Sequence, residues 1–272
     1  MFIIFKMPNS SKERVDLTNN ITNYLLIGLI AVMIVGFTSI NYKTTEGSVI
    51  SEAEGLPEAL QSQYTLQDSS GNILSTNAKL EPKMNFVIHI KNTMAYPEHK
   101  IDAIKDAIIS TETIEVPNNY LEIQPTNGTT TYFKGWLGAG INLRQTFGIA
   151  DGKPPTVEFV DFPENADVII IPTDHRSGDG SLGWTNSVID DDTRKIIRSS
   201  ITIYQFDQLT SDQIGVIMRH EGGHAVGLGH STDPKDLMYP TVETEYPYIS
   251  PCDILGRVAV IYEKTDSDVV CD

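Results

Sequence analysis

The sequence contains little cysteine and little positive charge. Its 272 residues include only two Cys, so it forms at most one disulfide and is not a small disulfide-stabilised scaffold. Lys and Arg number 20 against 36 Asp and Glu, which gives a formal net charge of -16. A chain this acidic does not bind nucleic-acid backbones by bulk electrostatics, so we predict no nucleic-acid partner. The hydrophobic content of 40% is too high for a disordered chain and allows a sizeable core.

Charge is missing altogether from one stretch near the amino terminus. No charged residue lies between Asp16 and Lys43, and residues 24–40 are largely apolar. A bilayer is crossed by roughly 17–25 apolar residues. We therefore predict a transmembrane signal-anchor at residues 21–42. Residues 1–20 would form a cytoplasmic tail because the nearby basic residues lie on that side.

A cleaved signal peptide is the alternative for this stretch. The apolar run is longer than a usual signal-peptide core, and no clear cleavage site follows it. Both arrangements place the remaining chain outside the cell, either as a single-pass membrane protein or, after cleavage, as a secreted one. Residues 43–83 are polar with scattered Gly and Ser, which predicts a tether or a short pro-segment with room for short ordered pieces such as residues 57–64.

After residue 83, strand and helix patterns alternate. Alternating or continuous apolar residues predict strands at 84–92, 156–162 and 166–172, and a hairpin at 187–204. Apolar residues at helical spacing predict helices at 97–110 and 132–147. A capping box formed by Thr210 and Gln213 predicts a helix start, and Pro251 predicts the start of a last helix. Segments 111–131 and 174–187 are predicted as loops. The fold class is α/β (α+β), with a mostly parallel sheet.

The motif HExxHxxGxxH, at residues 220–230, carries the chemistry. On a helix, His220 and His224 project from one face and suit a tetrahedral metal ion. Glu221 lies beside that face, where it can act as general base on a metal-bound water. Gly227 can adopt a positive φ and turn the chain, so that His230 supplies a third ligand. Three His ligands leave a fourth position open, which is typical of a catalytic zinc site.

With these residues the sequence resembles the metzincin clan of zinc endopeptidases, and within the clan the matrixins. Ser231 follows the third His, and Met238 lies in the run LMYP eight residues beyond His230. The resemblance implies one catalytic Zn²⁺ bound by the three His, Glu221 as the catalytic base and Met238 as the Met-turn beneath the metal.

The resemblance also implies the layout of the catalytic domain, which would span residues 84–272. An antiparallel edge strand within residues 180–186 would bind extended substrate by β-augmentation. An active-site helix and a carboxyl-terminal helix would complete the fold. The substrate pocket would be lined by Val216, Ile217, Pro240, Thr241 and Val242.

The sequence departs from the matrixin pattern in its cysteines and second metal sites. No Cys precedes Cys252, so the thiol that caps the zinc in matrixin pro-segments is absent. We predict a disulfide between Cys252 and Cys271, worth on the order of 3 kcal/mol; two free thiols are the alternative. Only His175 is available near Asp174 for a second zinc, so none is predicted.

Acidic residues at Asp179 and 190–192 are of the type that binds Ca²⁺, but a solvated acidic turn is the favoured interpretation. The predicted function is a membrane-anchored extracellular zinc endopeptidase acting on protein or peptide substrates. The alternatives are a catalytically silent zinc-containing surface-binding or adhesion protein, and a related hydrolase of a non-peptide substrate. The intact Glu221 and the open fourth position favour the peptidase, whose oligomeric state is not predicted.

Overall fold

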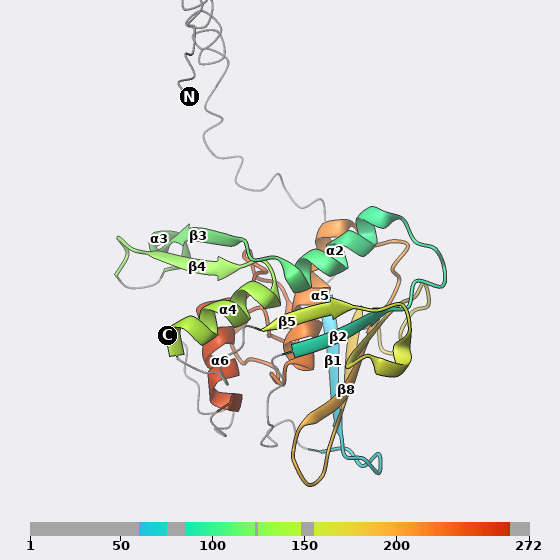
Figure 1. Ribbon diagram of the computed structural model, residues 1–272. Coiled ribbons are helices and arrows are strands. Elements are labelled where there is room, and N and C mark those ends of the chain that lie inside the picture. The colour runs from blue at the N-terminus through green and yellow to red at the C-terminus, as the bar shows by residue number, and fades with distance from the viewer. Residues whose placement is uncertain (1–59, 75–84, 123–124, 148–154, 262–272) are drawn as a thin grey trace, which may run out of the picture. The chain divides into compact units, whose positions relative to one another are not determined.

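The computed structural model describes residues 60–74, 85–122, 125–147 and 155–261 (Figure 1). The chain divides after Glu54, and all of these residues belong to the second unit, Gly55–Asp272. The predicted cytoplasmic tail and membrane anchor lie outside the described residues. Among the residues that are described, no helix has the length and apolar character that crossing a bilayer requires.

A seven-stranded sheet forms the frame of this unit, in the order β5-β2-β6-β8-β7-β1-β9. Four neighbouring pairs are parallel and two are antiparallel, so the predicted mostly parallel sheet is confirmed. The strands are β1 (Leu60–Gln67), β2 (Asn85–Ile90), β5 (Thr156–Phe159), β6 (Val168–Pro172), β7 (Gly183–Ile189), β8 (Ile196–Ile203) and β9 (Thr241–Val242).

The predicted helices are present: α2 (Glu98–Ile109), α4 (Trp136–Phe147), α5 (Ser211–Ala225) and α6 (Pro251–Ile261). Helix α2 packs against α5 through a stripe that includes the buried Ile104 and Ile108. Helix α5 begins at the predicted capping box, with both reciprocal bonds between Thr210 and Gln213 present. Its side chains from Gln213 onward are all buried, because the sheet, α2 and α4 pack around it.

The segment predicted as a loop at 111–131 contains regular structure, so that prediction is wrong. It holds β3 (Thr113–Pro117), the short α3 (Asn118–Leu121) and the beginning of β4 (Thr129–Phe133). Strands β3 and β4 form a separate two-stranded antiparallel sheet. Its sequence looks like a loop because Thr and Asn dominate it, and only Val116 and Phe133 of the two strands are buried.

Strand β1 lies inside the segment 43–83 that was predicted as a tether or short pro-segment, and it overlaps the short ordered piece expected at residues 57–64. Only Leu60 and Leu66 are buried, and the five residues between them are mostly polar, which hides the strand in the sequence. Because β1 pairs with β7, the antiparallel strand β7 is not the edge strand that was predicted. That strand also begins at Gly183, inside the loop predicted for 174–187.

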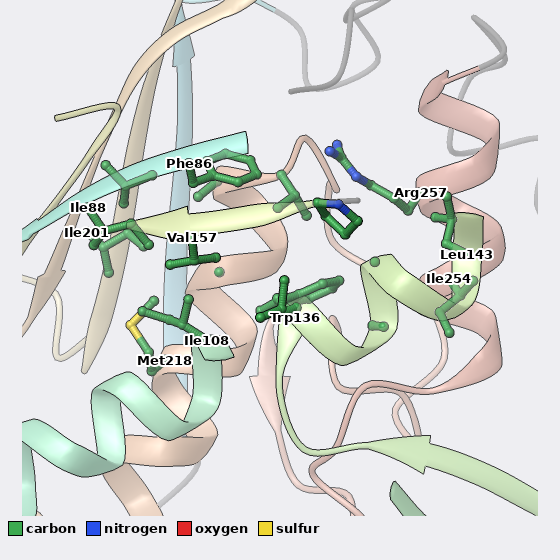
Figure 2. A pocket seen from close by; sticks show the side chains of 18 residues that line it. Phe86, Ile88, Ile108, Trp136, Leu143, Val157, Ile201, Met218, Ile254 and Arg257 are labelled. Atoms are coloured by element: carbon green, nitrogen blue, oxygen red, sulfur yellow. The ribbon is translucent and has the colours of Figure 1, made fainter. Parts of the chain in front are cut away.

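An apolar pocket lies between the sheet and helices α4, α5 and α6 (Figure 2). Phe86, Val157 and Ile201 face into it from the strands, and Trp136 and Met218 face into it from the helices. Helix α5 thus turns one face to this pocket, whereas the His side chains of the motif are not among the lining residues.

Candidate metal centre and active site

Three His side chains from the motif converge on one point. The Nε2 atom of His224 lies 3.2 Å from the Nε2 atoms of both His220 and His230. In tetrahedral zinc coordination with Zn–N distances near 2.0–2.1 Å, neighbouring ligand nitrogens are about 3.3–3.4 Å apart. The spacing of these nitrogens therefore fits a zinc ion.

The backbone fixes which ring nitrogen of the His residues faces the metal position. The Nδ1 atom of His220 lies 2.7 Å from the carbonyl oxygen of Leu237, and Nδ1 of His224 lies 2.8 Å from that of Leu228. A carbonyl oxygen only accepts, so both Nδ1 atoms carry the proton and both Nε2 atoms keep a free lone pair. Burial lowers the pKa of His220 to about 3 and also lowers the pKa values of His224 and His230, which favours the neutral form that a metal ligand needs.

The end of α5 brings the third His into place. Gly227 has a φ of 98°, as the motif predicted. Its N–H donates to the carbonyl of His224, and the N–H of Leu228 donates to that of Gly223, which together form a Schellman motif. This reversal turns the chain back, so that His230 reaches the other two His rings.

Glu221 lies beside the His cluster and is fully buried. Thr185 of β7 donates a hydrogen bond to its Oε2 atom at 2.6 Å, and Ser62 of β1 donates one to its Oε1 atom at 2.5 Å. Burial raises the pKa of Glu221 to about 8, although both hydrogen bonds act in the opposite direction. A Cβ atom at Gly183 would collide with this carboxylate, so the glycine makes room for it.

Two glycines of α5 allow close packing, Gly223 against Met238 and Gly222 against Trp136. Met238 is buried, and a Cβ atom at Gly223 would overlap its thioether. A Cβ atom at Gly222 would lie 2.7 Å from the indole of Trp136, whose Nε1 donates to the carbonyl of Arg219 at 2.7 Å. The two glycines of the motif therefore allow Met238 and Trp136 to approach the helix closely.

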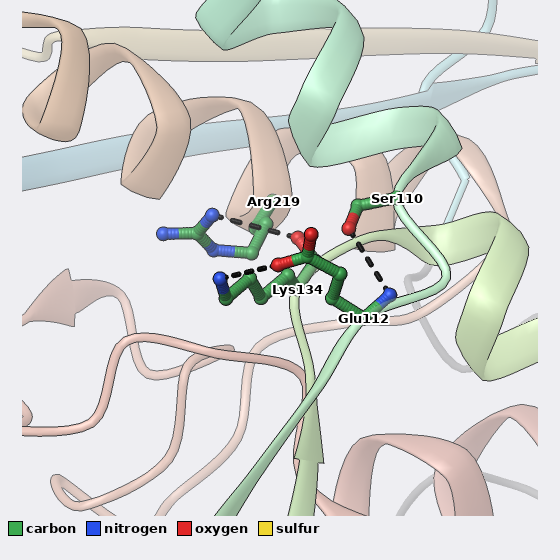
Figure 3. A network of polar contacts seen from close by, with 4 residues as sticks. All are labelled: Ser110, Glu112, Lys134 and Arg219. Carbon is green, nitrogen blue, oxygen red and sulfur yellow. Dashed lines mark hydrogen bonds and ion pairs between the residues drawn. The ribbon is translucent and has the colours of Figure 1, made fainter. Parts of the chain in front are cut away.

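Arg219, the residue before the motif, ties the active-site helix to two neighbouring segments. Its Nε donates to the carbonyl of Pro247 at 2.7 Å, and its guanidinium lies 4.7 Å from the ring centre of Tyr248. Figure 3 shows its second link, to the carbonyl of Lys134, beside the ion pair between Lys134 and Glu112. Arg219 thereby anchors the chain that follows β9.

The residues predicted to line the substrate pocket fall into two groups. Val216 and Ile217 are buried in the core on α5. Thr241 and Val242 form β9, which pairs with the first two residues of β1. The carbonyl of Pro240 accepts a hydrogen bond from the N–H of Ser62 at 3.0 Å. The wall of the predicted pocket that Pro240, Thr241 and Val242 form thus lies against strand β1.

Sequence reasoning missed Ser62, Tyr64, Thr185 and Trp136. The ring of Tyr64 is stacked on His224, with ring centres 4.4 Å apart and planes 2° from parallel. The inward residues of β1 are every second one, and this period of two was a signal that could have indicated a strand. Nothing in the sequence indicated that this strand would lie beside the motif, because Ser62 and Glu221 are 159 residues apart in the chain.

The other predicted sites give a mixed result. Cys252 is disulfide-bonded, and Cys271 lies outside the described residues. In the described part of the chain, the three His form the one cluster whose geometry suits a metal ion. Asp174 accepts from Tyr96, and Asp190 accepts from the backbone and hydroxyl of Thr193 in its own turn.

Comparisons with known proteins find one family model and relatives that match parts of the chain. The matrixin family model matches residues 165–259, about a third of the chain. Matrix metalloproteinase-20 of Homo sapiens is 59% identical over 32 residues, which are 12% of this chain and 7% of that protein. Matrix metalloproteinase-18 of Xenopus laevis is 38% identical over 56 residues, 20% of this chain and 12% of that protein. The matches thus cover far less than two thirds of either relative.

Proposed function

From the matrixin-like metalloprotease domain that the chain contains, we propose that it is a zinc-dependent endopeptidase of protein or peptide substrates. One observation carries the proposal. Three neutral His nitrogens converge at zinc-binding distances, and a buried carboxylate lies beside them. Both relatives are metalloproteinases by name, which supports peptide-bond hydrolysis rather than another reaction.

In the proposed mechanism, His220, His224 and His230 hold the metal through Nε2. Bound zinc supplies a Lewis acid that polarises a peptide carbonyl and makes water more acidic. The backbone carbonyls of Leu237 and Leu228 keep two of the rings oriented, so little reorganisation is needed during the reaction.

Glu221 moves the proton in this mechanism. Burial raises its pKa to about 8, close to neutral pH, so it is suited both to accept a proton from water and to return it to the leaving amine. Thr185 keeps the carboxylate oriented through Oε2, which leaves Oε1 as the atom that takes the proton once it is accessible.

We further propose that residues 21–42 anchor the chain in a membrane with the peptidase domain outside the cell. This rests on the uncharged run in the sequence and on the position of the basic residues. Protease treatment of intact cells tests it. Digestion of the domain in intact cells supports an outside location, and digestion only after lysis contradicts it.

We predict that Glu221→Gln retains the metal but loses peptidase activity by about 10²–10⁴-fold, since Gln accepts no proton from water. The full-length protein, in detergent, is incubated for long periods with casein and a peptide mixture. New peptides are then identified by mass spectrometry, and metal content is measured by atomic absorption.

A chelator provides the control, because it should abolish cleavage and zinc should restore it. Undiminished cleavage by the Gln variant would contradict the role of Glu221. One bound zinc without any chelator-sensitive cleavage, also after Tyr64 is replaced by Ala to uncover His224, would favour a catalytically silent binding protein.

A further inference from the structure

Strand β1 lies where an incoming extended peptide would have to bind. It pairs in parallel with β7 over six residue pairs, from Ser62 with Gly183 to Gln67 with Val188. On its other side, the first two residues of β1 pair antiparallel with β9. If β1 were absent, β7 and β9 would offer these backbone groups to another extended chain, as in β-augmentation.

Strand β1 fills the space between β7 and β9, the two sides of the expected substrate groove, and forms hydrogen bonds with the backbone on each side. The N–H of Leu182, just before β7, donates to the carbonyl of Gln61 at 2.9 Å. The N–H of Ser62 donates to the carbonyl of Pro240, just before β9, at 3.0 Å. A substrate peptide cannot make these hydrogen bonds while β1 holds them.

The inward side chains of β1 cover the reactive groups. Leu60 and Leu66 are buried at either end of the strand, and Ser62 and Tyr64 lie between them. The Ser62 hydroxyl donates a hydrogen bond to the Oε1 atom of Glu221, and the Tyr64 ring is stacked on His224. The exposed residues of the strand, Gln61 and Gln63, point the other way.

We propose that Leu60–Gln67 is an internal plug that holds the peptidase latent by filling its substrate groove and occupying the proton-accepting oxygen of Glu221. This proposal concerns the regulation of the active site and rests on the proposed peptidase function. Opening requires β1 to leave β7 and β9, after which substrate pairs with the same strand edge.

The chemistry of the plug differs from a metal-capping latch. The sequence LQSQYTLQ contains no Cys, His, Asp or Glu, so the contacts that block the site are backbone pairing, one hydroxyl and one aromatic ring. The plug therefore leaves the His nitrogens to the metal, and only hydrogen bonds and packing contacts, with no covalent or metal–ligand bond, need to break for it to open. A competing extended peptide or the loss of β1 pairing is enough to displace it.

The test uses the full-length protein in detergent and three variants of β1. Ser62→Pro removes both the N–H bonded to Pro240 and the hydroxyl bonded to Glu221. Tyr64→Ala removes the ring from His224. Gln61→Ala is the matched control, because it changes an exposed side chain of the same strand and keeps the backbone.

Two quantities are measured on each variant. The first is kcat/KM for a fluorogenic peptide, with zinc bound. The second is the affinity of the cobalt(II)-substituted protein for acetohydroxamate, a metal-binding probe, followed by visible absorption. Because two hydrogen bonds are lost, we expect Ser62→Pro to raise both kcat/KM and probe affinity about tenfold or more. Tyr64→Ala should raise both in the same direction, and Gln61→Ala should match the wild type.

Thermal unfolding shows which variants remain folded. If folded Ser62→Pro and Tyr64→Ala both bind the probe no better than the wild type, the plug is wrong. If Ser62→Pro unfolds, Tyr64→Ala alone decides whether the plug exists. A second test uses a synthetic peptide with the sequence of residues 60–67. Added to the opened Tyr64→Ala protein, it should weaken probe binding, and no effect would overturn the plug.

The two proposals fail in different ways. If probe affinity rises in the variants but no protein cleaves any peptide, the plug stands and the peptidase function falls. If the wild type and all variants cleave peptides at one rate and bind the probe equally, the function stands and the plug falls.

Discussion

Two glycines of α5 show how single residues set the packing around the motif. Gly222 faces the indole of Trp136, whereas Gly215, two turns earlier, has only the end of the Arg219 side chain nearby, at 3.5 Å from where a Cβ atom would lie. In helix interiors Ala is favoured over Gly by about 1 kcal/mol. Replacing each glycine by Ala therefore distinguishes the effect of helix propensity on stability from the effect of close packing.

We predict that Gly222→Ala lowers the free energy of unfolding by about 1–2 kcal/mol, because displacing the rigid indole outweighs the gain in helix propensity. Gly215→Ala is the matched control and should raise the same free energy by up to about 1 kcal/mol. Urea unfolding followed by circular dichroism measures both. Equal stabilisation by the two substitutions would show that Trp136 does not limit the space at Gly222.

At the scale of elements, α5 depends on its first residues as well as on its buried faces. The hydroxyl of Thr210 accepts from the N–H of Gln213 at 3.2 Å, and the side chain of Gln213 accepts from the N–H of Thr210 at 2.9 Å. These bonds satisfy donors that the first turn of a helix leaves unpaired. They fix where the helix starts, three turns before the His residues.

We predict that Thr210→Ala lowers the free energy of unfolding by about 0.5–2 kcal/mol, because the N–H of Gln213 loses its acceptor. Thr126→Ala, in an exposed turn, is the control and should change it by less than about 0.5 kcal/mol. Thermal and urea unfolding of both variants are compared with the wild type. If Thr126→Ala lowered the free energy of unfolding as much as Thr210→Ala, the cap would have no specific role.

Elements with strong local signals were predicted from the sequence, and those without were not. Helices α2, α5 and α6 have apolar residues at helical spacing and clear starts, and β6 is a continuous apolar run. Strands β1, β3 and β4 carry few apolar residues, so their stability comes from pairing with neighbours that a local pattern does not reveal. The site residues divide in the same way, because the motif is local and Ser62 and Tyr64 come from a distant strand.

At the scale of the whole molecule, packing places a carboxyl group in a dry environment. Asp253 caps α6 by accepting from the N–H of Ser250 at 2.7 Å, and it is almost fully buried. Burial, and next the neighbouring carboxyl of Asp236, raises the pKa of Asp253 well above its ordinary value of 3.8. In a protein with a formal net charge of -16, a further buried negative charge is unfavourable.

We predict that the stability contributed by protonated Asp253 is present at low pH and is lost as the pH rises from its ordinary pKa through its raised pKa in the folded state. Asp253→Asn keeps an acceptor for Ser250 and cannot ionise, so it should lose less stability between pH 5 and pH 8 than the wild type. Urea unfolding of the metal-free proteins at both pH values measures the difference. Burial also raises the pKa of Glu221 in both proteins, so its effect cancels. Parallel pH profiles would contradict the prediction.

The sequence by itself determined the three-His cluster that could hold a metal ion, because the spacing of His220 and His224 on one helix, and the turn at Gly227, are local consequences of chain geometry. It also determined the fold class through the alternation of apolar patterns. Only the tertiary structure decided that Leu60–Gln67 lies between β7 and β9, with Ser62 on Glu221 and Tyr64 on His224. Strand pairing uses backbone groups that every residue has, so the choice of partner depends on how the rest of the chain is packed.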